Sequence, residues 1–174
     1  TSLAEMSAWV AAIRPGFASL LNNFLDRLPY TTGVKELDNI LEDSFHYLTY
    51  QESIMKVLSF LGLPMSETYG IIKSISKKKL KGEKKDNLLK QLKKSWLDIF
   101  GNLDNFNNVW KVIEDSAFYA FNAPHAYSMA GDSLYQAWFK AHHTAKFYEV
   151  AITHYQEKNK KDKIDALVKE AMKF

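Results

Sequence analysis

The sequence predicts a mainly α-helical fold with at most one very short strand pair. Apolar residues recur at intervals of three and four along most of the 174 residues. Only seven glycines and four prolines interrupt the chain, and most stand where a helix would end. With 47% apolar residues, the chain can bury a real core, and its length fits one domain or one part of a larger protein.

Five helices are expected in the first half of the chain, each closed by a proline, a glycine or a polar stretch. They cover residues 3–13, 17–28, 34–41, 54–61 and a segment that begins near Pro64. Residues 44–50 are the only plausible strand, and that stretch is short.

The second half predicts five further helices. They cover residues 88–100, 109–118, 126–140, 146–155 and 165–172. Asn122 to His125 is expected as a break. The helix after it is expected to be buried, because Ala130, Gly131 and Ala137 would allow close packing.

The net charge of +3 hides a concentrated basic segment. Between Lys73 and Lys94 there are ten lysines and only two acids, whereas the remaining residues are mildly acidic as a group. Closely spaced cations can balance the charges of a phosphate chain. A solvated surface loop explains the same lysines equally well on charge alone.

Several classes of site are excluded by the residue types and their spacing. The chain has no cysteine, no His-Glu-x-x-His motif, no Asp-x-Asp pair, no glycine-rich phosphate loop and no Gly-x-Ser-x-Gly turn. No run approaches the ~20 apolar residues that cross a bilayer, and the N-terminus does not resemble a signal peptide. The residues alone favour a helical module that binds nucleic acid or polyphosphate, without a catalytic or metal site of its own.

Three stretches carry a more specific signal. They are Leu41–Met55 with Tyr50-Gln51-Glu52 at its centre, Ile72–Lys79, and Phe121–Phe147. In this order and spacing they resemble the fingers region of the C-family of bacterial replicative DNA polymerases, the alpha subunit of DNA polymerase III. Residues 13–16 and 162–174 extend the resemblance.

The resemblance implies a helical fingers subdomain over residues 1–157, followed at 158–174 by the start of a linker or helix that leads to a helix–hairpin–helix region. It implies binding of an incoming dNTP and of primer–template DNA in the cytoplasm, away from any membrane. The other partners would be the palm and the helix–hairpin–helix region. The segment itself needs no cofactor, because Mg²⁺ would be held by palm aspartates that these residues lack, so the segment alone is expected to be inactive.

The resemblance also assigns roles to single residues, none of them catalytic or metal-binding. The residues expected at the triphosphate are Lys73, Lys77, Lys78 and Arg14. The residues expected at DNA are Lys79, Lys81, Asn122 and His125. The sequence departs from the family pattern at Ile72, which replaces the first of two basic residues, and at Ala123-Pro124, which replace a Lys-Ser pair.

Two alternatives to these assignments stay open. Tyr50, Gln51, Glu52 and Met55 can be interpreted as residues that only support the fold. The departures at Ile72 and Ala123 favour a second hypothesis, in which a free-standing helical module uses the same scaffold to bind a protein partner or nucleic acid. An independent enzyme is disfavoured, since no catalytic constellation is present.

Overall fold

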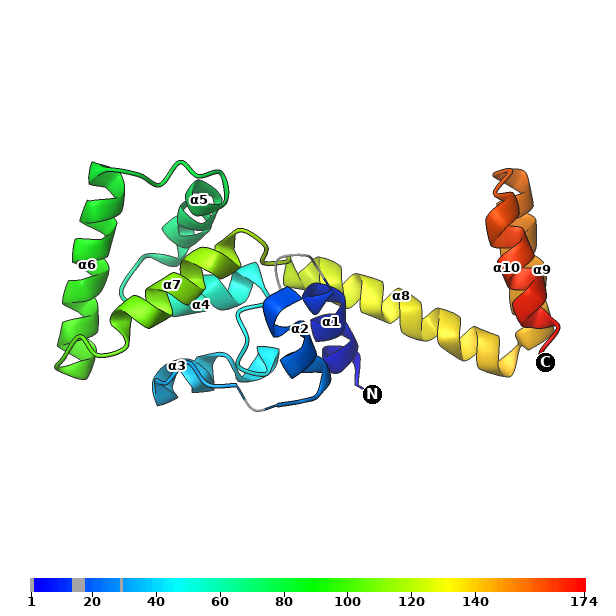
Figure 1. Cartoon of the computed structure of the whole chain (residues 1–174), viewed down its shortest axis with the longest axis horizontal. Coiled ribbons are helices and arrows are strands. Elements are labelled where there is room, and N and C mark those ends of the chain that lie inside the picture. Colours follow the sequence, from blue (N-terminus) through cyan, green and yellow to red (C-terminus); the bar gives the residue numbers. More distant parts are fainter. Residues whose placement is uncertain (1, 14–17, 29) are drawn as a thin grey trace. The chain divides into compact units, whose positions relative to one another are not determined.

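The computed structural model describes residues 2–13, 18–28 and 30–174, in which helices are joined by short connections (Figure 1). The α-helices of the described residues are α1 (Leu3–Ala12), α2 (Ala18–Leu25), α3 (Lys35–Ile40), α4 (Gln51–Phe60), α5 (Met65–Ser76), α6 (Glu83–Phe100), α7 (Phe106–Ala117), α8 (Ala123–His142), α9 (Thr144–Glu157) and α10 (Lys161–Ala171). The mainly α prediction is confirmed. The expected strand pair is reduced to one isolated parallel bridge between Tyr50 and Phe121.

The chain forms two compact units, and the boundary between them falls inside α8. The first unit runs to Ser128, and the second covers Met129–Phe174. The predicted boundary at residue 157 divides the fingers region from the start of a linker. It does not describe compact units, so it stays a prediction.

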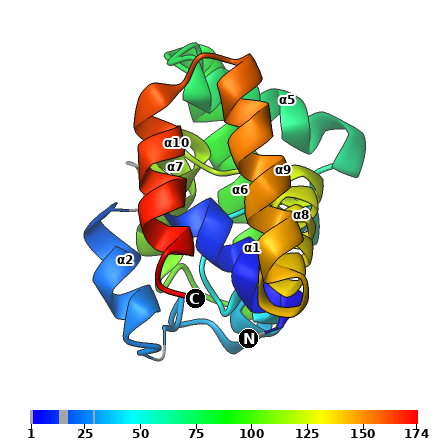
Figure 2. The same cartoon turned by 90° about the vertical axis from the view of Figure 1, so that its right-hand side faces the viewer.

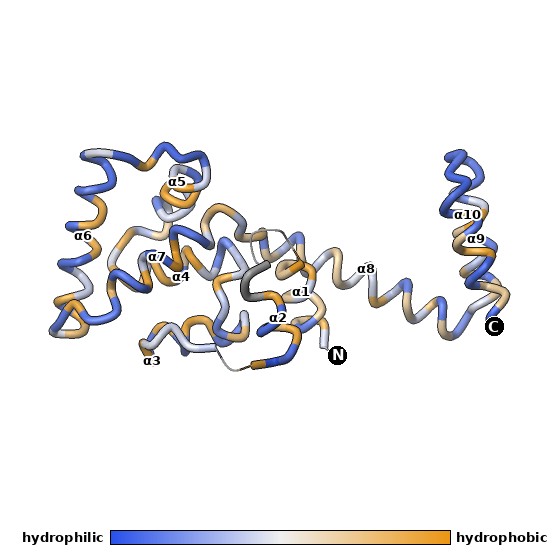
Figure 3. The backbone as a smooth tube through the Cα atoms, viewed as in Figure 1, coloured by the Kyte–Doolittle hydropathy of each residue, from blue (hydrophilic) through white to orange (hydrophobic). Residues whose placement is uncertain are grey.

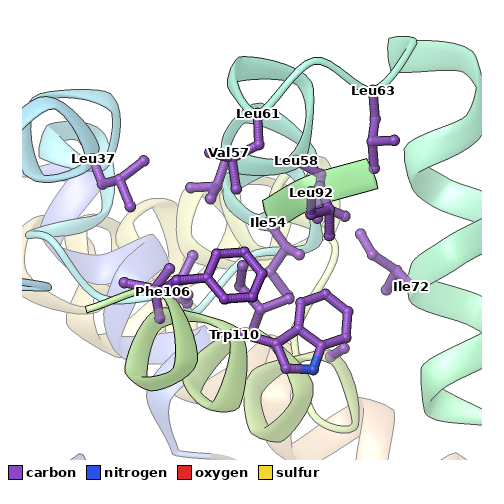
Figure 4. Close-up of a cluster of buried hydrophobic side chains, with 14 of the residues drawn as sticks. Leu37, Ile54, Val57, Leu58, Leu61, Leu63, Ile72, Leu92, Phe106 and Trp110 are labelled. Atoms are coloured by element: carbon purple, nitrogen blue, oxygen red, sulfur yellow. The ribbon is translucent and has the colours of Figure 1, made fainter. Parts of the chain in front are cut away.

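Helix α4 is the centre of the core of the first unit (Figure 4). Ile54, Val57, Leu58 and Leu61 are all buried, and their spacing of three and four places them on one face. Helices α3, α5 and α7 pack against this helix. Burial of four such side chains contributes on the order of 1.5–3 kcal/mol each.

Trp96 anchors the long helix α6 to this core. Its side chain is 1% exposed, and its ring lies 4.7 Å from that of Phe100 and 5.5 Å from that of Phe106, measured between centroids. The helix ends at Gly101, whose φ of 73° is a left-handed conformation that glycine adopts without strain. The lysines of α6 stay exposed or half-buried, as the apolar stripe of the sequence predicts.

A second, smaller cluster holds the start of α4 against the start of α8. Tyr50 and Phe121 pack with Ala11 of α1 and Ala126 of α8. The backbone N–H of Gln51 donates to the carbonyl of Phe121 at 2.9 Å. The Tyr50 hydroxyl lies 3.0 Å from Oγ of Ser7, a hydrogen bond in which either group can donate. Burial raises the pKa of the Tyr50 phenol above its ordinary value.

The second unit is built on the hairpin of α9 and α10, which lie side by side (Figure 2). Tyr148 of α9 is buried in this unit. Lys140 Nζ, near the end of α8, donates to Glu170 Oε1 of α10 at 2.5 Å.

The expectation of a buried helix at 126–140 is wrong. Of these residues only Ala126 and Ala130 are buried, whereas Tyr135 is 70% and Trp138 50% exposed. Small residues permit close packing, but their presence does not require that another segment packs there. The helix also begins earlier than expected, at Ala123, because Asn122 caps it and proline is tolerated in a first turn.

Candidate functional site

A pocket of the first unit lies where the start of α4, the middle of α5 and the segment before α8 meet. Its volume is about 510 Å³, and its walls are Gln51, Glu52, Met55, Tyr69, Lys73, Ala120, Phe121 and Asn122. The bridge between Tyr50 and Phe121 brings residues 120–122 to the first turn of α4. Segments about 70 residues apart in the sequence therefore form one concave surface.

Helix α5 supplies the cation of this pocket. Thr68, Ile72 and Ile75 are buried on one side of the helix, which leaves Tyr69 and Lys73 on another. Lys73 Nζ lies 5.0 Å from the centroid of the Tyr69 ring, the distance of a cation–π contact. This contact keeps the ammonium group at the pocket, and Lys73 is the only lysine or arginine among the described lining residues.

Glu52 and Asn122 form the polar wall of the pocket. Glu52 Oε1 accepts a hydrogen bond from Nδ2 of Asn122 at 2.8 Å, and Oε2 accepts one from the backbone N–H of Ala123 at 2.9 Å. Asn122 Oδ1 in turn accepts from the backbone N–H of His125 at 3.1 Å. The start of α8 is thus capped by two side chains, one of them on a different helix.

A second basic feature lies where α5 ends. We call Lys77, Lys78, Lys79 and Lys81 the lysine turn; all four are exposed, and Figure 3 shows the hydrophilic connection between α5 and α6. Lys78 has φ 54°, and its N–H donates to Ile75 O at 2.8 Å while that of Lys79 donates to Ser74 O at 2.7 Å. This is the Schellman pattern, with lysine at the position that usually holds glycine.

The lysine turn and Lys73 are not engaged by acids within the described residues. The ion pairs there join other side chains, such as Lys56 with Asp43 and Lys85 with Glu114. Cations at a helix C-terminus are also favoured by the helix dipole, which accounts for part of their presence without any ligand.

Six of the eight predicted site residues fall into two places. Lys73 and Asn122 share the pocket. The lysine turn, which contains Lys77, Lys78, Lys79 and Lys81, lies outside the pocket lining. His125 also lies outside it, with its ring centroid 5.3 Å from that of Phe121. Arg14 lies outside the described residues.

The residue assignments missed six of the eight lining residues, and those with polar side chains are Gln51, Glu52 and Tyr69. The first two belong to the Tyr-Gln-Glu motif, for which support of the fold was one open interpretation and to which no binding role was assigned. Tyr69 could have been found from its spacing, because it precedes Lys73 by one helical turn.

The described part of the chain offers neither a cluster of metal ligands nor a helix suited to a bilayer. No cluster of three or more histidine, aspartate or glutamate side chains there could hold a metal ion. None of its helices combines the length and the apolar character needed to cross a bilayer.

The chain is similar to known proteins over almost its whole length. Residues 1–95 match the family model described as "Bacterial DNA polymerase III alpha subunit finger domain". The DNA polymerase III subunit alpha of Aquifex aeolicus is 29% identical over 186 residues, which include 99% of this chain and 15% of that protein. The subunits of Bacillus subtilis and Thermotoga maritima are 33% and 32% identical over 84% and 59% of this chain. The chain spans only 14% and 12% of these two relatives.

Proposed function

Because the chain belongs to the family of bacterial DNA polymerase III alpha subunit finger domains, we propose that it binds an incoming dNTP and primer–template DNA. The observation that carries this proposal is the pocket in which Lys73 faces the polar wall of Glu52 and Asn122. The lysine turn supplies a second, more exposed cationic surface.

In this proposal the triphosphate binds at Lys73. A triphosphate carries roughly four negative charges, which a preorganised cation stabilises while it is held and transferred. Ile72, the neighbour that replaces a basic residue of the family pattern, is 0% exposed and belongs to the core. This position therefore cannot present a second cation to the pocket, so we expect weak nucleotide binding by the chain alone.

Lys77 and Lys78, which were expected at the triphosphate, lie with Lys79 and Lys81 on the lysine turn outside the pocket lining, so this proposal assigns the whole turn to the DNA backbone. Its four side chains are exposed and close together on one connection, which suits contact with successive phosphates. Contacts of this kind release counterions, so binding falls steeply as salt rises. We assign Asn122, which lines the pocket, and His125, which lies outside its lining, to contacts with DNA, since both side chains are exposed.

We assign the chemistry of nucleotide transfer to residues other than those of this chain. We propose that the chain alone does not polymerise DNA, and that palm aspartates of a longer polymerase hold Mg²⁺ and complete the active site. The palm and the helix–hairpin–helix region would then be its protein partners. The cytoplasmic location stays a prediction.

Fluorescence anisotropy with a labelled primer–template at several salt concentrations tests the DNA part of the proposal. The combined change Lys77→Glu, Lys78→Glu and Lys79→Glu should abolish binding. The matched control changes Lys158, Lys160 and Lys161 to Glu, because these lysines are equally exposed, lie in the other unit and alter the charge by the same amount. Equal effects of the two triple variants would refute a specific role for the lysine turn.

One observation favours a second candidate function. Tyr135, Trp138 and Phe139 of α8 are at least half exposed, more aromatic surface than a free helix usually leaves in water. A helical module that binds a protein partner would use such a face. A stable complex with an identified protein, together with no measurable affinity for DNA, would favour this function over the first.

A further inference from the structure

We propose that Glu52 is a positioning residue, which holds Asn122 and the first turn of α8 in the geometry that the nucleotide pocket requires. This inference rests on the proposed nucleotide binding at that pocket. It replaces the interpretation of Glu52 as general support of the fold with one defined role.

Two hydrogen bonds allow only one orientation of the side-chain amide of Asn122. Its Nδ2 donates to Glu52 Oε1 at 2.8 Å, and its Oδ1 accepts from the N–H of His125 at 3.1 Å. Turning the amide over would place a donor against the His125 N–H and an acceptor against the Glu52 carboxylate. The carboxylate therefore determines which polar atom of Asn122 faces α4.

The same carboxylate also holds the helix itself. Glu52 Oε2 accepts from the N–H of Ala123 at 2.9 Å, and Ala123 is the first residue of α8. The first N–H groups of a helix have no partner within the helix, so this bond satisfies a group that would otherwise turn to water. A negative charge at a helix N-terminus is also stabilised by the helix dipole.

Only an ionised carboxylate can accept both bonds at once. The amide of glutamine has one acceptor and one donor, so its nitrogen would face either the Ala123 N–H or Nδ2 of Asn122, and one of the two bonds would be lost. The change Glu52→Gln is nearly identical in shape, so it removes a hydrogen bond without creating a cavity.

The positioning role and Coulomb repulsion predict opposite effects of Glu52→Gln on the affinity for an anionic ligand. Glu52 lines the same pocket as Lys73, so Coulomb repulsion alone would make an anionic ligand bind more tightly once the carboxylate is neutralised. Positioning predicts weaker binding, because either the Asn122 amide or the first turn of α8 loses the hydrogen bond that fixes it. The sign of the change therefore separates the two explanations.

Anisotropy with N-methylanthraniloyl-dATP and the full chain provides the measurement. For Glu52→Gln we expect the dissociation constant to rise about tenfold, the loss that corresponds to one hydrogen bond to a charged group. The matched control is Glu67→Gln, because Glu67 is also an acid in a first helical turn but lies outside the pocket. The control should bind as the unchanged chain does.

A double variant tests whether binding returns when the hydrogen-bond pair is restored with reversed polarity. Asn122→Asp alone places two carboxylates in hydrogen-bond contact and should weaken binding more than Glu52→Gln does. The pair E52Q/N122D reverses the polarity: the new amide nitrogen donates to the new carboxylate, and the new amide oxygen accepts from Ala123. The double variant should bind within about twofold of the unchanged chain, although each single change weakens binding.

Each result decides the matter. Unchanged or tighter binding by Glu52→Gln, or a double variant no better than Asn122→Asp, overturns the positioning role. If a single variant loses helix content by circular dichroism, the double variant still tests the pairing, since it restores both bonds. Absence of nucleotide binding by the unchanged chain removes the proposed function itself, and this inference with it.

Discussion

Changing Lys78 to glycine should stabilise the fold and weaken DNA binding at the same time. Lys78 stands just after the last turn of α5 with φ 54°, a conformation that side chains with a Cβ adopt only at a cost. If the Lys78 ammonium contacts a DNA phosphate, this contact explains why lysine stands at a position where glycine would suit the backbone better.

The size of the stability change follows from three opposing effects. Relief of the left-handed conformation contributes roughly 1–2 kcal/mol. The greater flexibility of glycine in the unfolded chain opposes this by about 0.5–1 kcal/mol, and loss of a cation near the helix C-terminus by about 0.3 kcal/mol. The net gain of about 0.5 kcal/mol corresponds to a rise in apparent Tm of about 1–2 °C for a chain of this length.

Thermal unfolding by circular dichroism and DNA anisotropy at several salt concentrations measure the two effects. Loss of one phosphate contact should reduce the slope of log K against log salt by about 0.9. Lys79→Gly is the matched control, because it removes the same charge from the next residue, which is not left-handed. The control should lose DNA affinity without gaining stability.

Two results would refute this reasoning. A lower Tm for Lys78→Gly would show that the backbone at this position is not strained by lysine. An unchanged salt slope would show that Lys78 does not contact a phosphate, whatever its effect on stability.

Three other changes test the pocket, the core and the carboxylate of Asp38. Lys73→Met keeps the bulk of the side chain and should weaken binding of dATP at least tenfold while Tm stays nearly constant, as measured by anisotropy and circular dichroism. Ile54→Ala removes a fully buried side chain and should lower the free energy of unfolding by about 2–5 kcal/mol in a denaturant titration. Burial alone would raise the pKa of Asp38, but hydrogen bonds from Thr31 and Thr32 lower this pKa below its ordinary value. The stability that this carboxylate contributes is therefore present at neutral pH and lost as pH falls through its folded pKa. In denaturant titrations Thr32→Val should destabilise more at pH 7 than in acid, where only the loss of the Thr32 hydrogen bonds with Val34 remains.

Much of the local structure could be predicted because helix formation depends on nearby residues. The spacing of Ile54, Val57, Leu58 and Leu61 predicts one face of α4, and the structure confirms that this face is buried. The resemblance of three short stretches also predicted the family, which the match over residues 1–95 confirms.

The burial of α8 could not be predicted in the same way. Small residues such as Ala130 and Ala137 show that another segment could pack closely, but not that one does. Among the described residues Ala130 is buried, whereas Ala137 and the aromatic side chains near it are exposed. Burial is a property of what lies opposite, and the pattern of a single helix contains no information about its partner.

The sequence by itself determined the helices, the concentration of lysines and the family. Tertiary structure alone decided which of these lysines shares a pocket with Asn122, and that Glu52 caps a helix some 70 residues away. The reason is the separation along the sequence of the residues that set each feature. Helical periodicity is set within four residues, whereas the meeting of α4 and α8 depends on the packing of Tyr50, Phe121 and Ala126 in one cluster.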